Sequence, residues 1–207
     1  MYKHVIKRIL DILLSLGGIL LLWLPMVFVA IAIKLDTPGP VFFTQRRVGL
    51  HKKEFTIYKF RTMRMEAPHE SAPAVLDLEA VQFTKLQLFL RASSIDELPQ
   101  LLNILIGNMS IIGPRPCLWN EFELIEKRDA CRAYEALPGL TGWAQVNGRD
   151  ELPMDVKVGY DAEYVDKLSF AMDMKCFFMT IAKVLRREGV VEGGVPVQEM
   201  QKEGVNQ

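Results

Sequence analysis

The sequence predicts a mostly helical α+β protein, in which an N-terminal apolar membrane helix joins a small domain with a few short strands and amphipathic helices. Three observations predict this fold class. Residues 12–33 contain no charged side chain, and a helix of that length, at about 1.5 Å per residue, reaches across a hydrocarbon core of about 30 Å. Residues 41–60 hold two strand-like runs around a glycine. Residues 98–105 and 174–187 repeat apolar side chains at helical spacing.

Length and charge limit the organisation of the chain. Its 207 residues fit one folded domain plus a short additional element. We assign residues 1–36 to the membrane helix, residues 37–190 to a domain at the membrane interface and residues 191–207 to a C-terminal tail. A formal net charge of zero gives no signal for nucleic acid, and no such partner is expected. Three cysteines without metal-site spacing indicate a reducing compartment and argue against a disulfide framework or a zinc site.

The apolar N-terminal run is open to three interpretations. A cleaved signal peptide has some support from the Ala-Ile-Ala of residues 30–32, although the run exceeds the usual apolar length of about 7–15 residues. A helix that spans the bilayer is the default. A helix that enters and turns back is favoured by Pro25, which removes a backbone donor near the middle. Basic residues on both sides give no clear orientation. On the residues alone, spanning and re-entrant helices are about equally supported.

Basic side chains gather on two short segments after the apolar run. Residues 41–45 and 55–60 have the composition of strands around a turn at Gly49. The cations of this region are Arg46, Arg47, Lys59, Arg61 and Arg64. Beside a membrane helix such a face suits anionic headgroups or phosphates, although a solvated strand face explains any single cation equally well. Residues 65–81, polar and proline-bearing, are predicted to form a surface loop.

The stretch from Arg91 to Pro116 is the centre of the prediction. Two adjacent acids, Asp96 and Glu97, are expected to begin a helix that ends at Gly107-Asn108, a sequence suited to a left-handed cap. A rigid Gly113-Pro114-Arg115-Pro116 segment then fixes the direction of one cation. Acids at a helix start, with arginines before and after them, could handle a phosphate.

A purely structural role for these acids is the main alternative. Ser94-x-x-Glu97 is a capping box, and acids in a first helical turn are stabilised by the helix dipole. On spacing alone, capping is the favoured explanation. The argument for chemistry therefore depends on the other motifs of the chain.

Three later segments complete the pattern. Residues 118–137 are charge-rich and predict a helix. Residues 138–149 form a glycine-punctuated loop with a tryptophan and an arginine, where backbone amides could approach a ligand and polar side chains suit a nucleotide base. This loop matches neither the GxxxxGK[ST] nor the GxGxxG phosphate-binding motif. Residues 174–187 predict an amphipathic helix that lies at a membrane interface or, equally, packs on the core.

Five motifs, taken in order, resemble the monotopic phosphoglycosyl transferases, the bacterial sugar transferase family that begins polyprenol-linked glycan assembly. The resemblance covers roughly residues 2–189, and the chain looks like the small, minimal form of the family. The motifs are Gly39-Pro40-Val41-Phe42-Phe43-x-Gln45, Tyr58-Lys59-Phe60-Arg61-Thr62-Met63, Ser94-Ile95-Asp96-Glu97-Leu98-Pro99-Gln100-Leu101, Gly113-Pro114-Arg115-Pro116 and residues 138–149. Together they are far more specific than any one alone. They also favour the re-entrant helix, because Pro25 matches the family's helix break.

The resemblance implies a two-step transfer of a sugar-1-phosphate from a UDP-sugar to a membrane-embedded polyprenol phosphate, usually undecaprenyl phosphate, with release of UMP. Asp96 matches the family's nucleophile and would carry the phosphosugar covalently. Glu97 matches its metal-binding acid, so Mg²⁺ is the expected cofactor. An aspartate with an ordinary pKa of about 4 is ionised at neutral pH and needs no base to act as a nucleophile.

The resemblance also implies binding residues and surroundings. The expected phosphate-binding cations are Arg91, Arg115, Lys59 and Arg61. The expected nucleotide-binding loop contains Gly142, Gln145, Asn147 and Arg149. The segment from Lys59 to Thr62 is expected to support the helix break. The implied location is the bacterial inner (cytoplasmic) membrane, with the catalytic domain on the cytoplasmic face and in contact with the lipid bilayer. A homo-oligomer and downstream glycosyltransferases are compatible further partners.

The chain departs from the family pattern at three places. Asn108 stands where an aspartate is common, Leu24 where a serine often precedes the helix-breaking proline, and Ala136-Leu137 where an arginine or valine often precedes Pro-Gly. These departures affect the finer assignments and leave both acids and Arg115 intact.

Two other functions stay open. One is a membrane-associated, Mg²⁺-dependent phosphohydrolase of UDP-sugars, and the other is a non-catalytic, membrane-anchored scaffold in which the acids only cap a helix. The sequence does not specify the sugar: an N-acetylated or deoxy-amino hexose, glucose and galactose all fit.

Overall fold

The computed structural model describes residues 1–63, 83–148, 152–186, 191–192 and 195–196. The predicted surface loop at residues 65–81 lies outside this range, as does most of the predicted tail. The helical elements are η1 (Tyr2–Ile6), α1 (Lys7–Asp36), η2 (Leu50–Lys52), α2 (Lys85–Ala92), η4 (Ile95–Glu97), α3 (Gln100–Ile106), α4 (Phe122–Ala130), η5 (Ala133–Glu135), α5 (Trp143–Val146), α6 (Met154–Asp166) and α7 (Phe170–Arg186). The strands are β1 (Phe42–Val48), β2 (Glu54–Phe60), β3 (Ser110–Ile112), β4 (Cys117–Leu118), β5 (Gly139–Thr141), β6 (Val191–Glu192) and β7 (Val195–Pro196). The described residues therefore form a mostly helical α+β fold.

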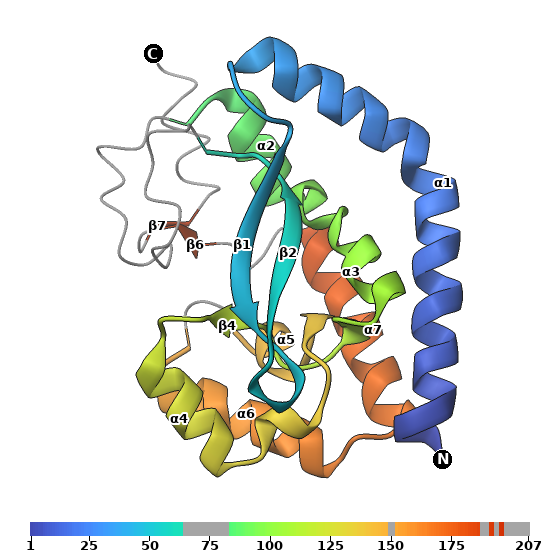
Figure 1. Cartoon of the computed structure of the whole chain (residues 1–207), viewed down its shortest axis with the longest axis vertical. Helices are drawn as coiled ribbons and strands as arrows, with labels where there is room; N and C mark the ends of the chain where they lie inside the picture. Colours follow the sequence, from blue (N-terminus) through green and yellow to red (C-terminus); the bar gives the residue numbers. More distant parts are fainter. Residues whose placement is uncertain (64–82, 149–151, 187–190, 193–194, 197–207) are drawn as a thin grey trace.

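Helix α1 is a single helix of 30 residues that continues through Pro25. It runs along one side of the molecule and changes direction in its second half (Figure 1). A proline inside a helix removes one hydrogen bond and pushes the preceding turn aside, which bends the helix. The predicted helix-break-helix thus takes the form of a bend within one continuous helix. Among the described residues, α1 is the one helix long and apolar enough to cross a membrane.

The N-terminal end of α1 is fixed to the rest of the fold by polar contacts. The Lys7 ammonium donates to the Asp173 carboxylate of α7 at 2.6 Å, and both side chains are buried. The Asp11 carboxylate accepts from the Ser110 hydroxyl at 3.0 Å and from the Ile111 amide at 2.9 Å. Arg8 donates to two carbonyls at the end of α3. Three polar residues near the start of a largely apolar helix, Lys7, Arg8 and Asp11, therefore form this junction.

The C-terminal end of α1 returns to the same domain. Ile33 is buried and packs in one apolar cluster with Phe60 of β2 and Leu90 of α2. The backbone carbonyl of Thr37, which follows the last turn, accepts a hydrogen bond from the Arg61 guanidinium at 2.7 Å. Both ends of α1 thus contact one domain, while many large apolar side chains between them are exposed.

A three-stranded sheet in the order β2-β1-β4 lies in front of the helices in Figure 1. Strands β1 and β2 are antiparallel, with Phe42 opposite Phe60 and Val48 opposite Glu54. They meet through a tight turn after Gly49, where His51 and Lys52 have positive φ. The sequence prediction of two strands around Gly49 is confirmed.

The central stretch folds as two helical pieces rather than one. The short helix η4 carries both acids, and α3 begins only after Pro99. Gly107 ends α3 with a φ of 103°, in the left-handed conformation predicted for it. The predicted helix at residues 118–137 is likewise divided into α4 and η5.

A second, two-stranded sheet pairs β3 with β5 in parallel. It requires two glycines, because a Cβ on Gly139 would lie 2.1 Å from the Gly113 nitrogen and a Cβ on Gly142 would lie 2.0 Å from the Gly113 oxygen. The main apolar cluster lies against this sheet and joins α5, α6 and α7 through Trp143, Tyr164 and their neighbours. This core holds residues 138–148 beside the stretch that contains Arg115.

Candidate active site

The two acids lie on the short helix η4, immediately after a strained residue. Ser94 has a φ of 56°, and its side chain makes no capping hydrogen bond. Asp96 and Glu97 are buried, at 8% and 6% exposure. The Glu97 carboxylate binds cations from other parts of the chain, so the capping-box alternative does not describe this structure. Buried carboxylates are rare unless they are paired, and these acids have nearby cations.

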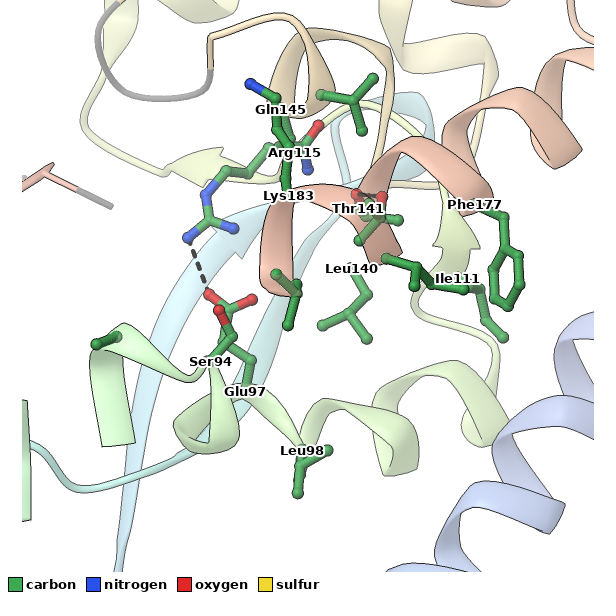
Figure 2. A pocket seen from close by; sticks show the side chains of 15 residues that line it. Ser94, Glu97, Leu98, Ile111, Arg115, Leu140, Thr141, Gln145, Phe177 and Lys183 are labelled. Carbon is green, nitrogen blue, oxygen red and sulfur yellow. Dashed lines mark hydrogen bonds and ion pairs between the residues drawn. The ribbon is translucent and has the colours of Figure 1, made fainter. Parts of the chain in front are cut away.

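Two cations from distant segments meet at Glu97. The Lys59 ammonium, on β2, donates to Glu97 Oε1 at 2.8 Å and lies 4.0 Å from Asp96 Oδ2. Arg115 Nη2 donates to the same Glu97 oxygen at 3.0 Å, as the dashed line in Figure 2 shows. Both were sequence-predicted site residues, and the fold brings both to the acids.

Two other predicted phosphate ligands have different surroundings. Arg91, at the end of α2, donates to the Thr62 hydroxyl at 3.3 Å and stacks over the Phe83 ring at 5.3 Å. Arg61 is 2% exposed, and its guanidinium donates to the Thr37 carbonyl and hydroxyl and to the Pro38 carbonyl. The prediction that Arg61 binds phosphate is therefore corrected: its donors hold the end of α1. These contacts lie at residues 37 and 38, beyond the C-terminal end of α1, so support of the break near Pro25 by the Lys59–Thr62 segment stays a prediction.

Arg115 is held by two arginines: Arg47, expected only as one cation of the basic region, and Arg128, which the sequence did not single out. Arg128 Nη1 donates to the Arg115 carbonyl at 2.8 Å, and Arg47 Nη1 donates to the Pro116 carbonyl at 3.1 Å. Burial, followed by the nearby Arg115 charge, lowers the pKa of Arg47 to about 10. The prolines on either side of Arg115 lack backbone donors, so side-chain donors to the carbonyls fix this segment.

Arg128 is itself buried in an ion pair. Its Nε and Nη2 atoms donate to Asp161 Oδ2 at 2.9 and 2.6 Å. Burial by itself would lower the pKa of Arg128, but the Asp161 carboxylate, together with the nearby Cys117 and Tyr134, raises the pKa above its ordinary value. A pattern search could not find this pair, because its members lie 33 positions apart on different helices.

Within the 138–149 segment, Gly142, Trp143 and Asn147 make their contacts inside the fold. Gly142 makes room for the Gly113 carbonyl rather than for a ligand. Trp143 is buried in the core, and its indole donates to Glu163 at 2.7 Å. Asn147 donates to the Trp143 carbonyl at 2.7 Å, within the loop itself. Arg149 lies outside the described residues.

Gln145 is the member of this loop that reaches the site. It is 8% exposed, and its amide oxygen and nitrogen have no hydrogen-bond partner among the described residues. Buried amides without partners are unfavourable, so this side chain is suited to a bound ligand. It lines a cavity of about 270 Å³ that Glu97 and Arg115 also line (Figure 2).

Helix α7 supplies the wall that the sequence analysis did not foresee. Lys183 lines the same cavity, together with Phe177, Ile181 and Val184. The amphipathic pattern of α7 was the available signal, but it did not say which residues face a ligand.

Comparison with known proteins gives the site its context. The family described as bacterial sugar transferase matches residues 2–187. The uncharacterized sugar transferase EpsL of Bacillus subtilis is 42% identical over 186 residues, which is 90% of either chain. The chain belongs to the bacterial sugar transferase family.

Other members of the family have more specific names. The UDP-glucose:undecaprenyl-phosphate glucose-1-phosphate transferase of Xanthomonas campestris pv. campestris is 39% identical over 191 residues, 89% of this chain and 40% of that protein. A UDP-N-acetylgalactosamine-undecaprenyl-phosphate N-acetylgalactosaminephosphotransferase of Aeromonas hydrophila is 36% identical over 185 residues, 87% of this chain and 44% of that protein. The chain thus spans nearly all of EpsL but less than half of these two longer relatives.

Asp96 and Glu97 by themselves are too few ligands to enclose a metal ion. Within the described ranges, no group of three or more His, Cys, Asp or Glu side chains could enclose an ion. Mg²⁺ commonly binds through one or two carboxylates together with substrate phosphates, so an adjacent Asp-Glu pair fits an ion that arrives with a diphosphate.

Proposed function

We propose that this protein is a phosphoglycosyl transferase that moves a sugar-1-phosphate from a UDP-sugar to undecaprenyl phosphate and releases UMP. Relatives named for this reaction match nearly all of the chain. The observation that carries the proposal is the buried Asp96–Glu97 pair, with Lys59 and Arg115 beside it, at the edge of a largely apolar cavity. Carboxylates and cations suit a diphosphate, and apolar walls suit a lipid.

The two acids would divide the work. Both Lys59 and Arg115 donate to one oxygen of Glu97, which holds that carboxylate in place. The Lys59 ammonium also lies 4.0 Å from Asp96 Oδ2. Asp96, which matches the family's nucleophile position, would attack phosphorus, and Glu97 would anchor the cations and Mg²⁺.

The reaction balances as two displacements at phosphorus. An Asp96 oxygen forms a bond to the β-phosphorus of the UDP-sugar, the bridging P–O bond breaks, and UMP leaves with its electron pair. A phosphate oxygen of the acceptor then bonds to the same phosphorus and the Asp96 carboxylate leaves. Both nucleophiles are anions already, so no general base is needed. Lys59 and Arg115 reduce the repulsion between these anions.

Mg²⁺ is part of the proposal, and the Glu97 carboxylate would hold it together with the donor's phosphates. When bound, it would supply positive charge to the phosphate oxygens. Lys59 and Arg115 hold the Glu97 carboxylate that would bind the ion, and they add two positive charges beside it.

Helix α1 would enter and leave the membrane on the cytoplasmic side. A straight helix of 30 residues is about 45 Å long, enough to place its ends on opposite faces of a bilayer. Both ends instead contact the same domain, through Lys7 and Asp11 at one end and Ile33 and Thr37 at the other. This supports a re-entrant helix.

Labelling tests this topology in a variant without the three native cysteines. Lys3→Cys and Lys34→Cys should both react with an impermeant maleimide in inside-out vesicles and resist it in intact spheroplasts. Opposite accessibility of the two positions would establish a spanning helix.

The central experiment traps the covalent intermediate. Wild-type enzyme incubated with a UDP-sugar and Mg²⁺, without acceptor, should gain the mass of a phosphosugar on the peptide that contains Asp96. Asp96→Asn should lose both this adduct and glycolipid formation, because an amide is a poor nucleophile. Glycolipid formation by Asp96→Asn would remove the assignment, and release of free sugar phosphate by the wild type would indicate a phosphohydrolase.

A further inference from the structure

The cavity beside the acids has two chemically different sides. Figure 2 shows Glu97, Arg115, Lys183 and Gln145 on one side. The other side carries aliphatic and aromatic side chains, among them Ile111, Leu140 and Phe177. These walls come from β3, β5 and α7, which the main core holds in place.

The apolar walls argue against a sugar or ribose as the occupant. Hydroxyl groups placed against Leu140 and Val184 would lose their hydrogen bonds to water without replacement. The hydroxyls of Thr141 and Thr180, which also line the cavity, bond to each other at 2.7 Å. A ligand with an apolar body and an anionic end matches the walls and the cations together.

We propose that this cavity holds the first isoprene units of the polyprenyl phosphate acceptor, with the phosphate at the Arg115 and Lys183 end. The inference rests on the proposed transfer to a polyprenol phosphate and names the place where that acceptor binds. The unpartnered Gln145 amide can donate to a phosphate oxygen there. In this position the acceptor's phosphate lies on the side of the cavity where Glu97, the neighbour of Asp96, is found.

The size and rim of the cavity fit the beginning of a long chain. Its volume of about 270 Å³ lies below the 300–1,000 Å³ typical of sites that enclose a whole small molecule. Ile181 and Val184 line the cavity and are also 42% and 47% exposed on α7. A chain that leaves the cavity passes these two side chains on the surface of α7.

A pair of matched substitutions on α7 tests the inference. Val184→Asn adds a polar amide inside the cavity rim, whereas Phe178→Asn adds the same amide to the same helix at an exposed position that does not line the cavity. Phe178 is the larger and more exposed side chain, at 66% against 47% for Val184, so an effect of lost membrane contact alone should be at least as large in Phe178→Asn. The Michaelis constant for undecaprenyl phosphate in nanodiscs should rise at least about tenfold more for Val184→Asn, because an apolar contact in a pocket is worth about 10–200-fold in discrimination.

The donor half-reaction separates failure of this inference from failure of the proposed function. Exchange of labelled UMP into UDP-sugar without acceptor should be the same in both variants. An exchange rate lowered only in Val184→Asn, with the acceptor constant unchanged, would assign the cavity to the nucleotide and overturn the inference. Equal acceptor constants in the two variants would also overturn it.

A photoreactive acceptor tests where the polyprenyl chain binds, without any turnover. Polyprenyl phosphate with a diazirine in its first isoprene unit, added to wild-type enzyme in nanodiscs and irradiated without donor, should label peptides from α7 or β5. Labelling confined to α1 would overturn the inference. This result is independent of UMP exchange, whose absence in the wild type would contradict the proposed function alone.

Discussion

Two clusters of acids and cations lie on either side of Arg115 and differ in how completely they are enclosed. Arg128 and Asp161 form a one-to-one pair with side-chain exposures of 3% and 1%. At Glu97, two cations share one oxygen, and the Lys59 and Arg115 side chains are 17% and 30% exposed. The Arg128–Asp161 pair is buried from solvent, and we call it the sealed pair. Glu97, Lys59 and Arg115 border a cavity, where the two cations can also contact a substrate, and we call them the open cluster.

The difference shows that burial separates the two roles of an acid–cation contact: the buried pair is structural, and the partly exposed cluster can bind a substrate. A buried ion pair gains little net stability, but breaking it leaves an uncompensated charge. The sealed pair holds the Arg115 backbone through the hydrogen bond from Arg128 to the Arg115 carbonyl. The open cluster is positioned by this contact, because Arg115 belongs to it, and its side chains would take part in the reaction.

Breaking the sealed pair should have the largest effect. Arg128→Met leaves the Asp161 carboxylate buried without its partner and should lower the free energy of unfolding by about 3–5 kcal/mol. Denaturant unfolding in detergent would measure this. The double variant Arg128→Met/Asp161→Leu removes both charges and should regain most of the loss. A single variant as stable as wild type would show that the pair is not the scaffold described here.

Changing an acid in the open cluster should alter activity rather than folding. Glu97→Gln keeps the size of the side chain but removes the charge that binds Lys59 and Arg115. We expect glycolipid formation to fall by about 10²–10³-fold, the usual effect of losing one electrostatic group in a preorganised site. The unfolding midpoint should change much less than in Arg128→Met, and a comparable loss of stability would contradict the comparison.

Arg115 connects the two clusters and should give the smallest effect when replaced conservatively. Arg115→Lys keeps the charge and the backbone carbonyl that Arg128 binds, but loses the planar fork of donors. Turnover should fall by about tenfold, with stability within about 0.5 kcal/mol of wild type because the side chain is partly exposed. Initial rates with saturating UDP-sugar and a melting curve test both parts. An unfolding change as large as that of Arg128→Met would show that the side chain belongs to the scaffold.

Local patterns predicted the features that depend on neighbours in sequence. The apolar run gave α1, the Gly49 turn gave the β1–β2 hairpin, and Gly107 ended α3 with a positive φ. The family motifs named Asp96, Glu97, Lys59 and Arg115, and the fold places the two cations against Glu97. These features follow from backbone preferences, apolar periodicity and motif chemistry, all of which are written along the chain.

Other assignments failed because they depend on where side chains point. Arg61 carries the same charge as Lys59 two residues earlier, but β2 ends at Phe60 and Arg61 lies beyond the strand. Its guanidinium binds Thr37 after the end of α1, whereas the Lys59 ammonium binds Glu97. Gly142 looked like a ligand-binding glycine, but the parallel pairing of β3 with β5 brings the Gly113 carbonyl against it.

The sequence by itself determined that the chain has a long apolar helix, a basic hairpin, a paired acid and the motifs of its family. Only the tertiary structure decided that both ends of α1 contact one domain, that Arg128 and Asp161 hold Arg115, and that α7 closes a cavity beside the acids. The physical reason is range: helix and turn preferences act over a few residues, whereas these contacts join residues that only packing of the whole fold brings together.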